Sequence, residues 1–312
     1  MILGMSTVNR QPSTEIHISV CICAYKRPQM LSNLLNKLQD QVTENQFTHS
    51  TVVVDNDASQ SAREVVKGWQ DKSVIPIDYH CEPEQNIALA RNKAIANAKG
   101  NFIAFIDDDE FPDNTWLINL IKTQLKYKSA GVLGPFKPYF EVQPPQWITK
   151  SKICERSSFP TGTILNNSNQ TRTGNVLLSK KLFTDQPLSF NPEFGRTGGE
   201  DVDFFSRMMN KGLIFVWCNE ANVYEIVPPE RFKKSFYLKK ALLRGEVNGS
   251  RTHILSLSAL KSVAAFIVYT IALPFFLLFN QHLFMKYLIK DCDHMGKLLG
   301  ICGIVFVKER NF

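Results

Sequence analysis

The chain has 312 residues, of which 44% are hydrophobic and 21% charged, and it carries a formal net charge of +7. This composition excludes a disordered or fibrous protein and suffices for one large α/β domain with an additional segment. The seven Cys have no metal-ligand spacing, and their odd number is typical of reduced thiols. Residues 1–15 are expected to form a polar N-terminal extension without the apolar stretch of a signal peptide.

The positive charge is concentrated in the last quarter of the chain. Residues 1–230 contain 23 Lys and Arg against 25 Asp and Glu, whereas residues 231–312 contain 13 against 4. Residues 262–279 contain no charged side chain, and their length is near the lower limit for spanning a bilayer. We therefore expect the partner of this tail to be an anionic membrane surface rather than nucleic acid.

The sequence predicts a main domain at 16–230, a basic amphipathic connector at 231–258 and a hydrophobic, membrane-associated helical segment at 259–312. Lys and Arg side chains precede the apolar run, and the positive-inside rule places them in the cytoplasm. Pro274 within the run is as compatible with a kinked or re-entrant segment as with a straight span. A buried core hairpin is the alternative interpretation.

Strands and helices are predicted to alternate along the first half of the chain. Strands are expected at 16–24, 51–54, 75–79 and 102–106, and helices at 28–38, 61–69, 87–98 and 114–127. Later elements are expected as a strand at 175–178, a helix at 200–210 and a strand at 214–217. This alternation predicts a mostly parallel sheet with helices on both faces, whose ligands bind beyond the carboxyl ends of the strands.

Four adjacent carboxylates, from Asp107 to Glu110, follow the apolar strand at 102–106. They repel one another unless a cation is present. Side chains at i and i+2 of an extended segment point the same way, so Asp107 and Asp109 can share one Mg²⁺ or Mn²⁺ while Asp108 points elsewhere. The alternative is a solvated acidic turn.

A second acidic pair, Glu200 and Asp201, follows Gly198 and Gly199 at the start of a predicted helix. The glycines would let the backbone approach a ligand closely. The alternative is that Asp201 only stabilises the helix N-terminus, where a carboxylate is favourable.

Other candidates each have an ordinary structural alternative. Asp55 and Asp57 could bind a nucleobase or ribose, or form an Asx turn. Asn86 lies at a helix start, and Arg91, one turn further, could pair with a diphosphate or be a surface arginine. Trp147 could stack on an acceptor sugar or pack in the core.

Several familiar chemistries are absent from the sequence. It contains no GxxxxGK[ST] or GxSxG motif, and its six His have no metal-ligand spacing. A sugar nucleotidyltransferase would need a Gly-rich loop after the first strand, where AYKRP has no Gly. A membrane-tethered protein that binds nucleotide-sugars without catalysing a reaction is the alternative to an enzyme.

Four pieces together resemble the family 2 glycosyltransferases of the GT-A fold. They are VCICAYKRP, VVVDND, PEQNIALARNKAIANAKGNFIAFIDDDEFPDNTWL and GGEDVDFFSRM, and the resemblance covers roughly residues 16–250. The stretches PEQNIALARN and FIDDDE are most similar to bacterial members that extend succinoglycan-type exopolysaccharides. The resemblance implies a Rossmann-like α/β sheet flanked by helices.

The resemblance also implies roles for individual residues. The nucleotide-sugar would be bound by Ala24, Tyr25, Arg27, Asp55, Asp57, Asn86, Arg91, Asp107 and Asp108. Asp107 and Asp109 match the DxD motif that holds the metal, and Asp201, with Glu200 before it, matches the acid that deprotonates the acceptor. Many members have a metal-proximal His where this chain has Glu225, which either replaces it as an oxygen ligand or leaves the metal more loosely held.

The function implied is inverting transfer of a sugar, with a UDP-sugar as the expected donor. The cofactor would be Mn²⁺ or Mg²⁺, and the acceptor a saccharide linked to polyprenyl diphosphate. Such an enzyme would work at the bacterial inner membrane with its catalytic domain in the cytoplasm. The donor sugar, the linkage and the oligomeric state stay open.

Overall fold

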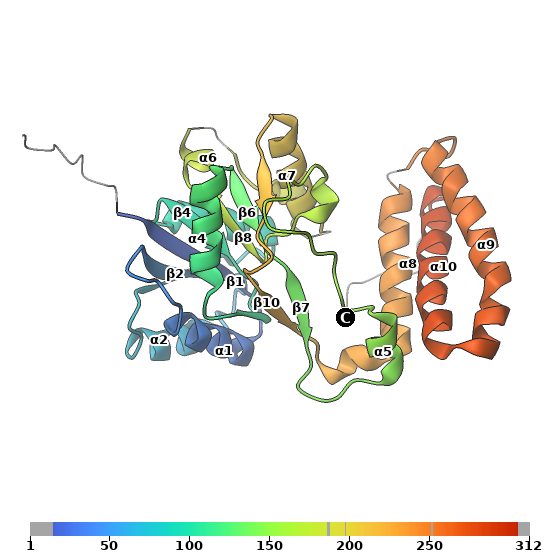
Figure 1. The fold of residues 1–312 in the computed structure, drawn as a ribbon, viewed down its shortest axis with the longest axis horizontal. Coiled ribbons are helices and arrows are strands. Elements are labelled where there is room, and N and C mark those ends of the chain that lie inside the picture. The colour runs from blue at the N-terminus through green and yellow to red at the C-terminus, as the bar shows by residue number, and fades with distance from the viewer. Residues whose placement is uncertain (1–14, 186–187, 197, 251, 305–312) are drawn as a thin grey trace, which may run out of the picture. The chain divides into compact units, whose positions relative to one another are not determined.

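The computed structural model describes residues 15–185, 188–196, 198–250 and 252–304. These residues form two compact units, each of which is described by itself (Figure 1). The first unit combines Met1–Lys137 with Arg156–Glu225, and the second combines Pro138–Glu155 with Ile226–Phe312. The chain leaves the first unit after Glu225, and residues 138–155, which lie within the main domain expected at 16–230, belong to the second unit.

The first unit is built on a seven-stranded sheet of order β3-β2-β1-β4-β8-β6-β9. Its strands are β1 His17–Ala24, β2 Thr48–Asp55, β3 Ile77–Cys81, β4 Phe102–Phe105, β6 Gly131–Leu133, β8 Val176–Ser179 and β9 Phe215–Trp217. The pairs β2–β3, β1–β2, β1–β4 and β6–β9 are parallel, and only β8 runs antiparallel to its neighbours. The predicted mostly parallel sheet is confirmed.

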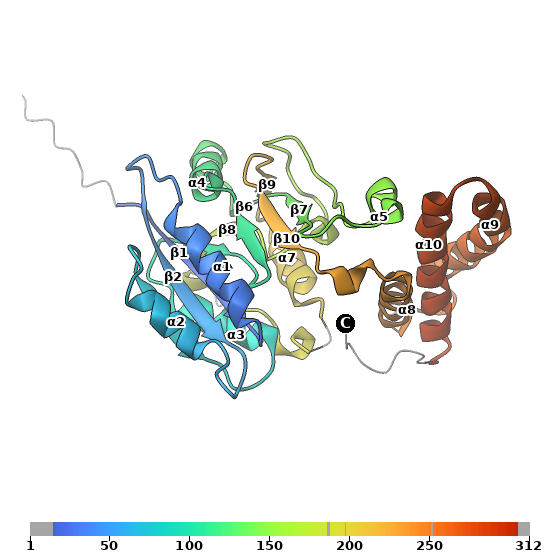
Figure 2. The same cartoon turned by 90° about the horizontal axis from the view of Figure 1, so that it is seen from below.

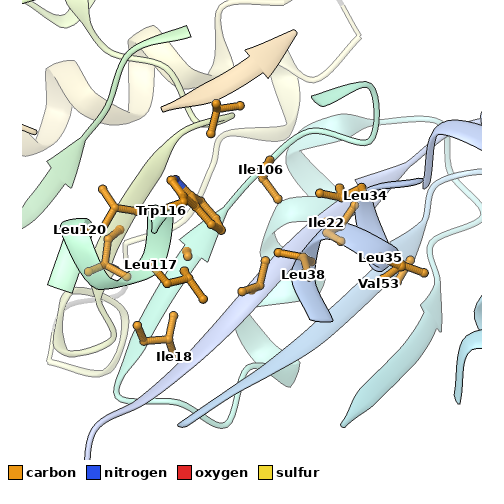
Figure 3. Packing of buried hydrophobic residues seen from close by; sticks show 14 of the residues in the cluster. Ile18, Ile22, Leu34, Leu35, Leu38, Val53, Ile106, Trp116, Leu117 and Leu120 are labelled. Carbon is orange, nitrogen blue, oxygen red and sulfur yellow. The ribbon is translucent and has the colours of Figure 1, made fainter. Parts of the chain in front are cut away.

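Helices cover both faces of this sheet (Figure 2). The helices of this unit are α1 Pro28–Gln39, α2 Arg63–Gln70, α3 Ile87–Asn97, α4 Trp116–Tyr127, α6 Lys181–Thr184 and α7 Glu200–Asn210, with 3₁₀ turns η1 Ser168–Gln170 and η2 Pro192–Phe194. Helices α1, α2 and α4 pack on one face and α3 and α7 on the other, because strand residues alternate between the two cores. Figure 3 shows the first core, where leucines of α1 and α4 meet Ile18 and Ile22 of β1.

A small second sheet, of order β5-β10-β7, was not predicted. It consists of β5 Glu110–Pro112, β10 Val223–Ile226 and β7 Phe136–Tyr139. Their sequences, EFP, VYEI and FKPY, interrupt the apolar residues with charged residues or Pro, so they lack the continuous apolar run that predicts the strand at 102–106. In this sheet β10 pairs antiparallel with β5 and places Glu225 opposite Glu110.

The loop before β8 is fixed by the fully buried Asn175. Its side-chain carbonyl accepts a hydrogen bond from the indole of Trp116 at 2.8 Å, and its amide donates to the carbonyls of Pro135 (2.9 Å) and Ala221 (2.8 Å). Three segments distant in sequence are thereby joined, and the preceding residue, Gly174, is held beside the acidic turn that follows β4.

The second unit contains α5 Gln146–Ser151, η3 Pro229–Phe232, α8 Lys234–Ser250, α9 Leu257–Phe279 and α10 Gln281–Ile301. Helix α10 packs between α8 and α9 (Figure 1). Backbones of α8 and α10 approach closely at Gly245 and Gly249 on one helix and Gly296 and Gly300 on the other, where any added Cβ would lie 2.2–2.3 Å from a carbonyl oxygen. Helix α9 is long and apolar enough to cross a membrane.

Candidate active site

The acidic run forms a turn rather than an extended segment. Strand β4 ends at Phe105, and the backbone N–H of Glu110 donates to the carbonyl of Asp107 at 3.2 Å before β5 begins. The extended geometry predicted for Asp107 to Asp109 is therefore wrong. The turn gives each carboxylate a different neighbourhood, which spreads their mutual repulsion over several partners.

Asp108 anchors this turn to the end of β1. Its carboxylate is buried and accepts hydrogen bonds from the backbone N–H of Tyr25 at 3.0 Å and from the guanidinium of Arg27 at 2.8 Å. Arg27 also lies 3.1 Å from Asp109. Burial raises the pKa of Asp108 to about 6, although Arg27 opposes the shift. Ala24, the last residue of β1, is buried, so its side chain is not accessible to a ligand.

Asp107 has the most exposed of the three aspartate side chains in the turn, at 44% against 16% for Asp109 and 4% for Asp108. The pKa of Asp107 is raised to about 6, mainly by desolvation of its carboxyl group. The nearby negative charges of Asp109, Asp201 and Glu200 also raise this pKa, whereas Arg91 lowers it. Acidic groups from the turn and from α7 therefore influence the same place. A cation there would relieve this repulsion.

Gly174 makes room for two of these carboxylates. A Cβ at this position would lie 2.7 Å from Oε2 of Glu110 and 2.9 Å from Oδ2 of Asp107. A Cβ atom essentially never lies this close to another heavy atom, so a larger residue would push these two carboxylate groups aside. The sequence shows this Gly only as part of RTGN at the start of the strand expected at 175–178.

Glu200 and Asp201 begin α7 after Gly199, whose φ of 96° is in the left-handed region that favours glycine. Glu200 is buried and forms an ion pair of 2.6 Å with Arg91. Asp201 keeps 15% of its side chain exposed, and its Oδ2 is 3.6 Å from the guanidinium of Arg172. The structure thus separates two residues that were both predicted to be catalytic: Glu200 is occupied by Arg91, whereas Asp201 reaches the surface of the site.

Arg91 does not have the surroundings expected for a diphosphate ligand. It is only 6% exposed and bridges Glu200 to Asp107, which is 3.6 Å away, while its guanidinium lies 5.5 Å from the ring centre of Phe190. Its positive charge is already balanced by two carboxylates of the protein. Its position indicates that it connects the acidic turn to the start of α7.

Glu110 and Glu225 face each other across β5 and β10, and Arg156 forms an ion pair with Glu225. Arg156 also lies over the ring of Phe136, 4.8 Å from its centre. Burial, then the charges of Asp107, Asp109 and Glu225, raises the pKa of Glu110 well above its usual range. A metal ion bound by Glu225, as expected, would have to compete with Arg156 for the Glu225 carboxylate.

The side chains of the site could supply only part of the coordination shell of a divalent cation. Within the described residues, no three His, Cys, Asp or Glu side chains come together as a ready-made ligand group. Asp107 and Asp109 offer oxygen ligands near each other, and Mg²⁺ is commonly held by one or two carboxylates with substrate phosphates completing its shell. The residues therefore suit a cation that is bound together with a diphosphate.

Two of the residues expected at the nucleotide, Asp55 and Asp57, hold loops in place. Asp55 is fully buried and accepts from the backbone N–H of Ala62 at 2.7 Å and the hydroxyl of Tyr79 at 3.1 Å. Asp57 forms a local turn with Ser59, whose hydroxyl lowers the pKa of the Asp57 carboxyl. The structural alternative, an Asx-type turn, describes Asp57.

Asn86 is the N-cap of α3. Its side-chain oxygen accepts from the backbone N–H groups of Ala88 (3.1 Å) and Leu89 (3.3 Å), and its amide donates to Pro192. These bonds use its hydrogen-bonding groups, so its expected contact with the nucleotide is replaced by a structural role.

Trp147 belongs to the second unit and packs there in a hydrophobic cluster with Ala241, Met285 and Ile289. It is 8% exposed, and its ring meets that of Tyr237 edge-on with centroids 5.6 Å apart. This is core packing, the alternative considered from sequence, and it leaves no exposed ring face for the expected acceptor contact.

Comparison with known proteins places the chain in a family. Residues 19–187 match the description "Glycosyl transferase family 2". The chain belongs to this family. It is 33% identical over 242 residues to the succinoglycan biosynthesis protein ExoM of Rhizobium meliloti, which is 76% of each chain. It is also 24% identical over 258 residues to the chondroitin synthase of Pasteurella multocida, covering 73% of this chain but 26% of that protein.

Solved structures agree on the fold. Residues 1–349 of S. aureus TarS in complex with UDP-GlcNAc superpose with a TM-score of 0.54 at 15% sequence identity, covering 93% of each chain. The complex of the same TarS fragment with UDP gives a TM-score of 0.53 at 16% identity. The predicted GT-A fold is confirmed, as is the resemblance to succinoglycan-type enzymes.

Two arginines of the site were missed from the sequence. Arg156 and Arg172 lie between the helix expected at 114–127 and the strand expected at 175–178, and each faces an acidic residue of the site. The only signal in the sequence concerned Arg172, a basic residue directly before TGN and a predicted strand. This pattern is too common to single out a site residue.

Proposed function

We propose that this glycosyltransferase is a metal-dependent, inverting enzyme that moves a sugar from a UDP-sugar to a saccharide carried on a lipid. One observation carries the proposal: Arg91 connects Asp107 of the acidic turn to Glu200, the neighbour of Asp201 in α7. This link would keep the proposed donor-binding turn and the proposed acceptor base at a fixed separation within one compact unit. Family membership and a relative named for succinoglycan biosynthesis support it.

Asp107 and Asp109 would hold the cation, which when bound supplies charge to stabilise the departing diphosphate. Asp201 would accept the proton of the acceptor hydroxyl as its oxygen attacks the anomeric carbon. The new bond forms on the face opposite the breaking bond to the diphosphate, so the sugar is transferred in one displacement with inversion. No covalent intermediate is required.

Arg172 is better suited than Arg91 to contact the donor diphosphate. Its side chain is 46% exposed, whereas that of Arg91 is 7% exposed and paired with two carboxylates. Its loop is pinned beside the acidic turn by buried Thr173 and Asn175, and a guanidinium can bind phosphate oxygens in a bidentate manner.

The lipid-linked acceptor is proposed from the C-terminal part of the chain. Residues 231–312 are basic, and α9 is a candidate membrane segment. These features favour an acceptor on polyprenyl diphosphate at the inner membrane, with the catalytic unit in the cytoplasm. The chondroitin and hyaluronan synthases among the relatives also act in polysaccharide synthesis by name, but this chain spans only about a quarter of their length.

The test uses membranes containing the full chain, Mn²⁺ and a panel of radiolabelled nucleotide-sugars, with label followed into the lipid fraction. The variant Asp201→Asn should lower transfer by about 100- to 10,000-fold, the usual contribution of a general base, while UDP binding is kept. The matched control is Asp203→Asn on the same helix, whose carboxylate pairs with Arg207 instead of facing the site.

Different outcomes separate the alternatives. Near wild-type transfer by Asp201→Asn would rule out Asp201 as the base. Donor binding without transfer by the unaltered chain to any lipid fraction would favour the non-catalytic binder. Release of pyrophosphate from a nucleoside triphosphate would indicate a nucleotidyltransferase.

A further inference from the structure

Helix α9 presents a large apolar surface. Ten of its large hydrophobic side chains are exposed: Leu257, Leu260, Val263, Ile267, Val268, Ile271, Phe275, Leu277, Leu278 and Phe279. The exposed fractions reach 74% at Ile271 and 82% at Leu278. Contiguous apolar surface of this kind marks a contact with another molecule or with lipid.

The opposite side of α9 is attached to α10 along its length. Near one end of α9, Lys297 of α10 donates to the hydroxyl of Ser258 at 2.6 Å. In the middle, the hydroxyl of Thr270 donates to Asp291 at 3.2 Å. Towards the other end, the rings of Phe276 and Tyr287 are stacked with centroids 4.6 Å apart. Figure 1 shows the two helices side by side over this span.

Helix α10 is unsuited to the interior of a bilayer. Its 21 residues correspond to about 31 Å, close to the thickness of the hydrocarbon layer. Five charged side chains are distributed along it: Lys286, Lys290, Asp291, Asp293 and Lys297. If α9 crossed the membrane with α10 attached, several of these charges would lie near the midplane, where charged side chains are strongly unfavourable.

Helix α8 holds α10 in this position. The glycines of α8 and α10 bring the two backbones into direct contact, and Arg244 of α8 forms an ion pair of 2.7 Å with Asp293. Such close packing through small residues is lost entirely if the helices part. The three helices therefore have to meet the membrane as a group.

We infer that α9 lies in the plane of the membrane, with its exposed apolar face in one leaflet and both its ends on the same side. The bound partner is a lipid surface containing anionic headgroups, which the basic side chains of α8 and α10 would meet at the headgroup level. This deepens the membrane attachment in the proposed function but does not depend on the transfer reaction.

The experiment locates the two ends of α9 relative to the membrane. Variants His253→Cys, in the loop before α9, and Asn280→Cys, at its C-cap, are labelled with a membrane-impermeant maleimide on spheroplasts and on inverted membrane vesicles. The parent chain gives the background from its native cysteines. Both new cysteines should react in inverted vesicles only. Reaction of one end from each side would show that α9 spans the bilayer and would overturn the inference.

A second measurement tests the apolar face itself. The double variant Ile271→Lys/Leu278→Lys should shift the chain from the membrane pellet to the supernatant, lowering the bound fraction about tenfold or more. The control is Val74→Lys, an equally exposed valine of the first unit. Unchanged pelleting of the double variant, or an unaltered chain that never pellets, would overturn the inference. If the labelling and pelleting experiments both give the expected results but the unaltered chain transfers no sugar, only the proposed function is contradicted.

Discussion

Replacing Arg91 with Met tests whether a buried ion pair connects the two acidic motifs. Arg91 and Glu200 have side chains only 7% and 10% exposed, and their nearest charged atoms are 2.6 Å apart. Methionine preserves the length of the side chain but removes its charge. Glu200 would then be left as a buried carboxylate without its cation, and breaking a buried pair in this way costs about 3–5 kcal/mol.

That loss is large compared with the total stability of a typical domain, about 5–15 kcal/mol. Urea unfolding of the detergent-solubilised chain, followed by tryptophan fluorescence, measures it. The matched control is Arg196→Met, because Arg196 pairs with Glu84 at 3.2 Å but both side chains are more than half exposed. Exposed pairs of this kind contribute about 0–1 kcal/mol.

The double variant Arg91→Met/Glu200→Leu separates stability from function. Removing both charges should recover much of the lost free energy of unfolding, since no buried charge is left unpaired. It should not recover transfer, because the connection from Asp107 to the start of α7 is still absent. If Arg91→Met is no less stable than Arg196→Met, the buried pair does not stabilise the site and the reasoning is refuted.

Three further predictions concern the acidic turn and the second unit. Gly174→Ala should weaken Mn²⁺-dependent UDP binding at least about tenfold, since a misplacement of about 1 Å is costly in such sites, and calorimetry with Gly68→Ala as control would show it. The raised pKa of Asp107, about 6, means that its proton competes with the metal, so Mn²⁺ affinity should fall as the pH drops below about 6 and level off above it. Trp147→Ala should destabilise the second unit by about 3–5 kcal/mol in thermal unfolding while UDP affinity stays the same; a lower UDP affinity would contradict its assignment to the core.

The fold was predictable where a segment shows its own hydrophobic pattern. The apolar strand at 102–106 and the helix at 200–210 were both found within about a residue of the expected bounds, since burial of a continuous face fixes them. Strand β5 was not predicted because its sequence, EFP, lacks a continuous apolar run. The extended geometry predicted for Asp107 to Asp109 failed for a related reason: the strand pattern gives no information about where the chain turns back.

The site was less predictable than the fold, because its contacts join residues far apart in sequence. Arg91 and Glu200 are separated by 109 positions, so the sequence could not show that the arginine is paired internally. Asn86 and Asp57 looked like ligand contacts because the side chains that cap helices and close turns are the same ones that bind nucleotides. For Trp147 the sequence left an acceptor contact and core packing both open, because residues 138–155 join helices formed some 90 residues later.

The charges of the site point to how its ligands arrive. Acidic groups from the turn, α7 and β10 are each met by an arginine from a different element: Arg27, Arg91, Arg156 and Arg172. A divalent cation alone would upset this balance, and a diphosphate alone would meet the carboxylates of Asp107 and Asp109. A cation and a diphosphate entering together bring nearly compensating charges, and the cation shields the phosphates from the carboxylates. By linkage, each of the two should strengthen the binding of the other by the same factor. The arrangement of arginines and carboxylates therefore favours the metal–nucleotide complex over either component.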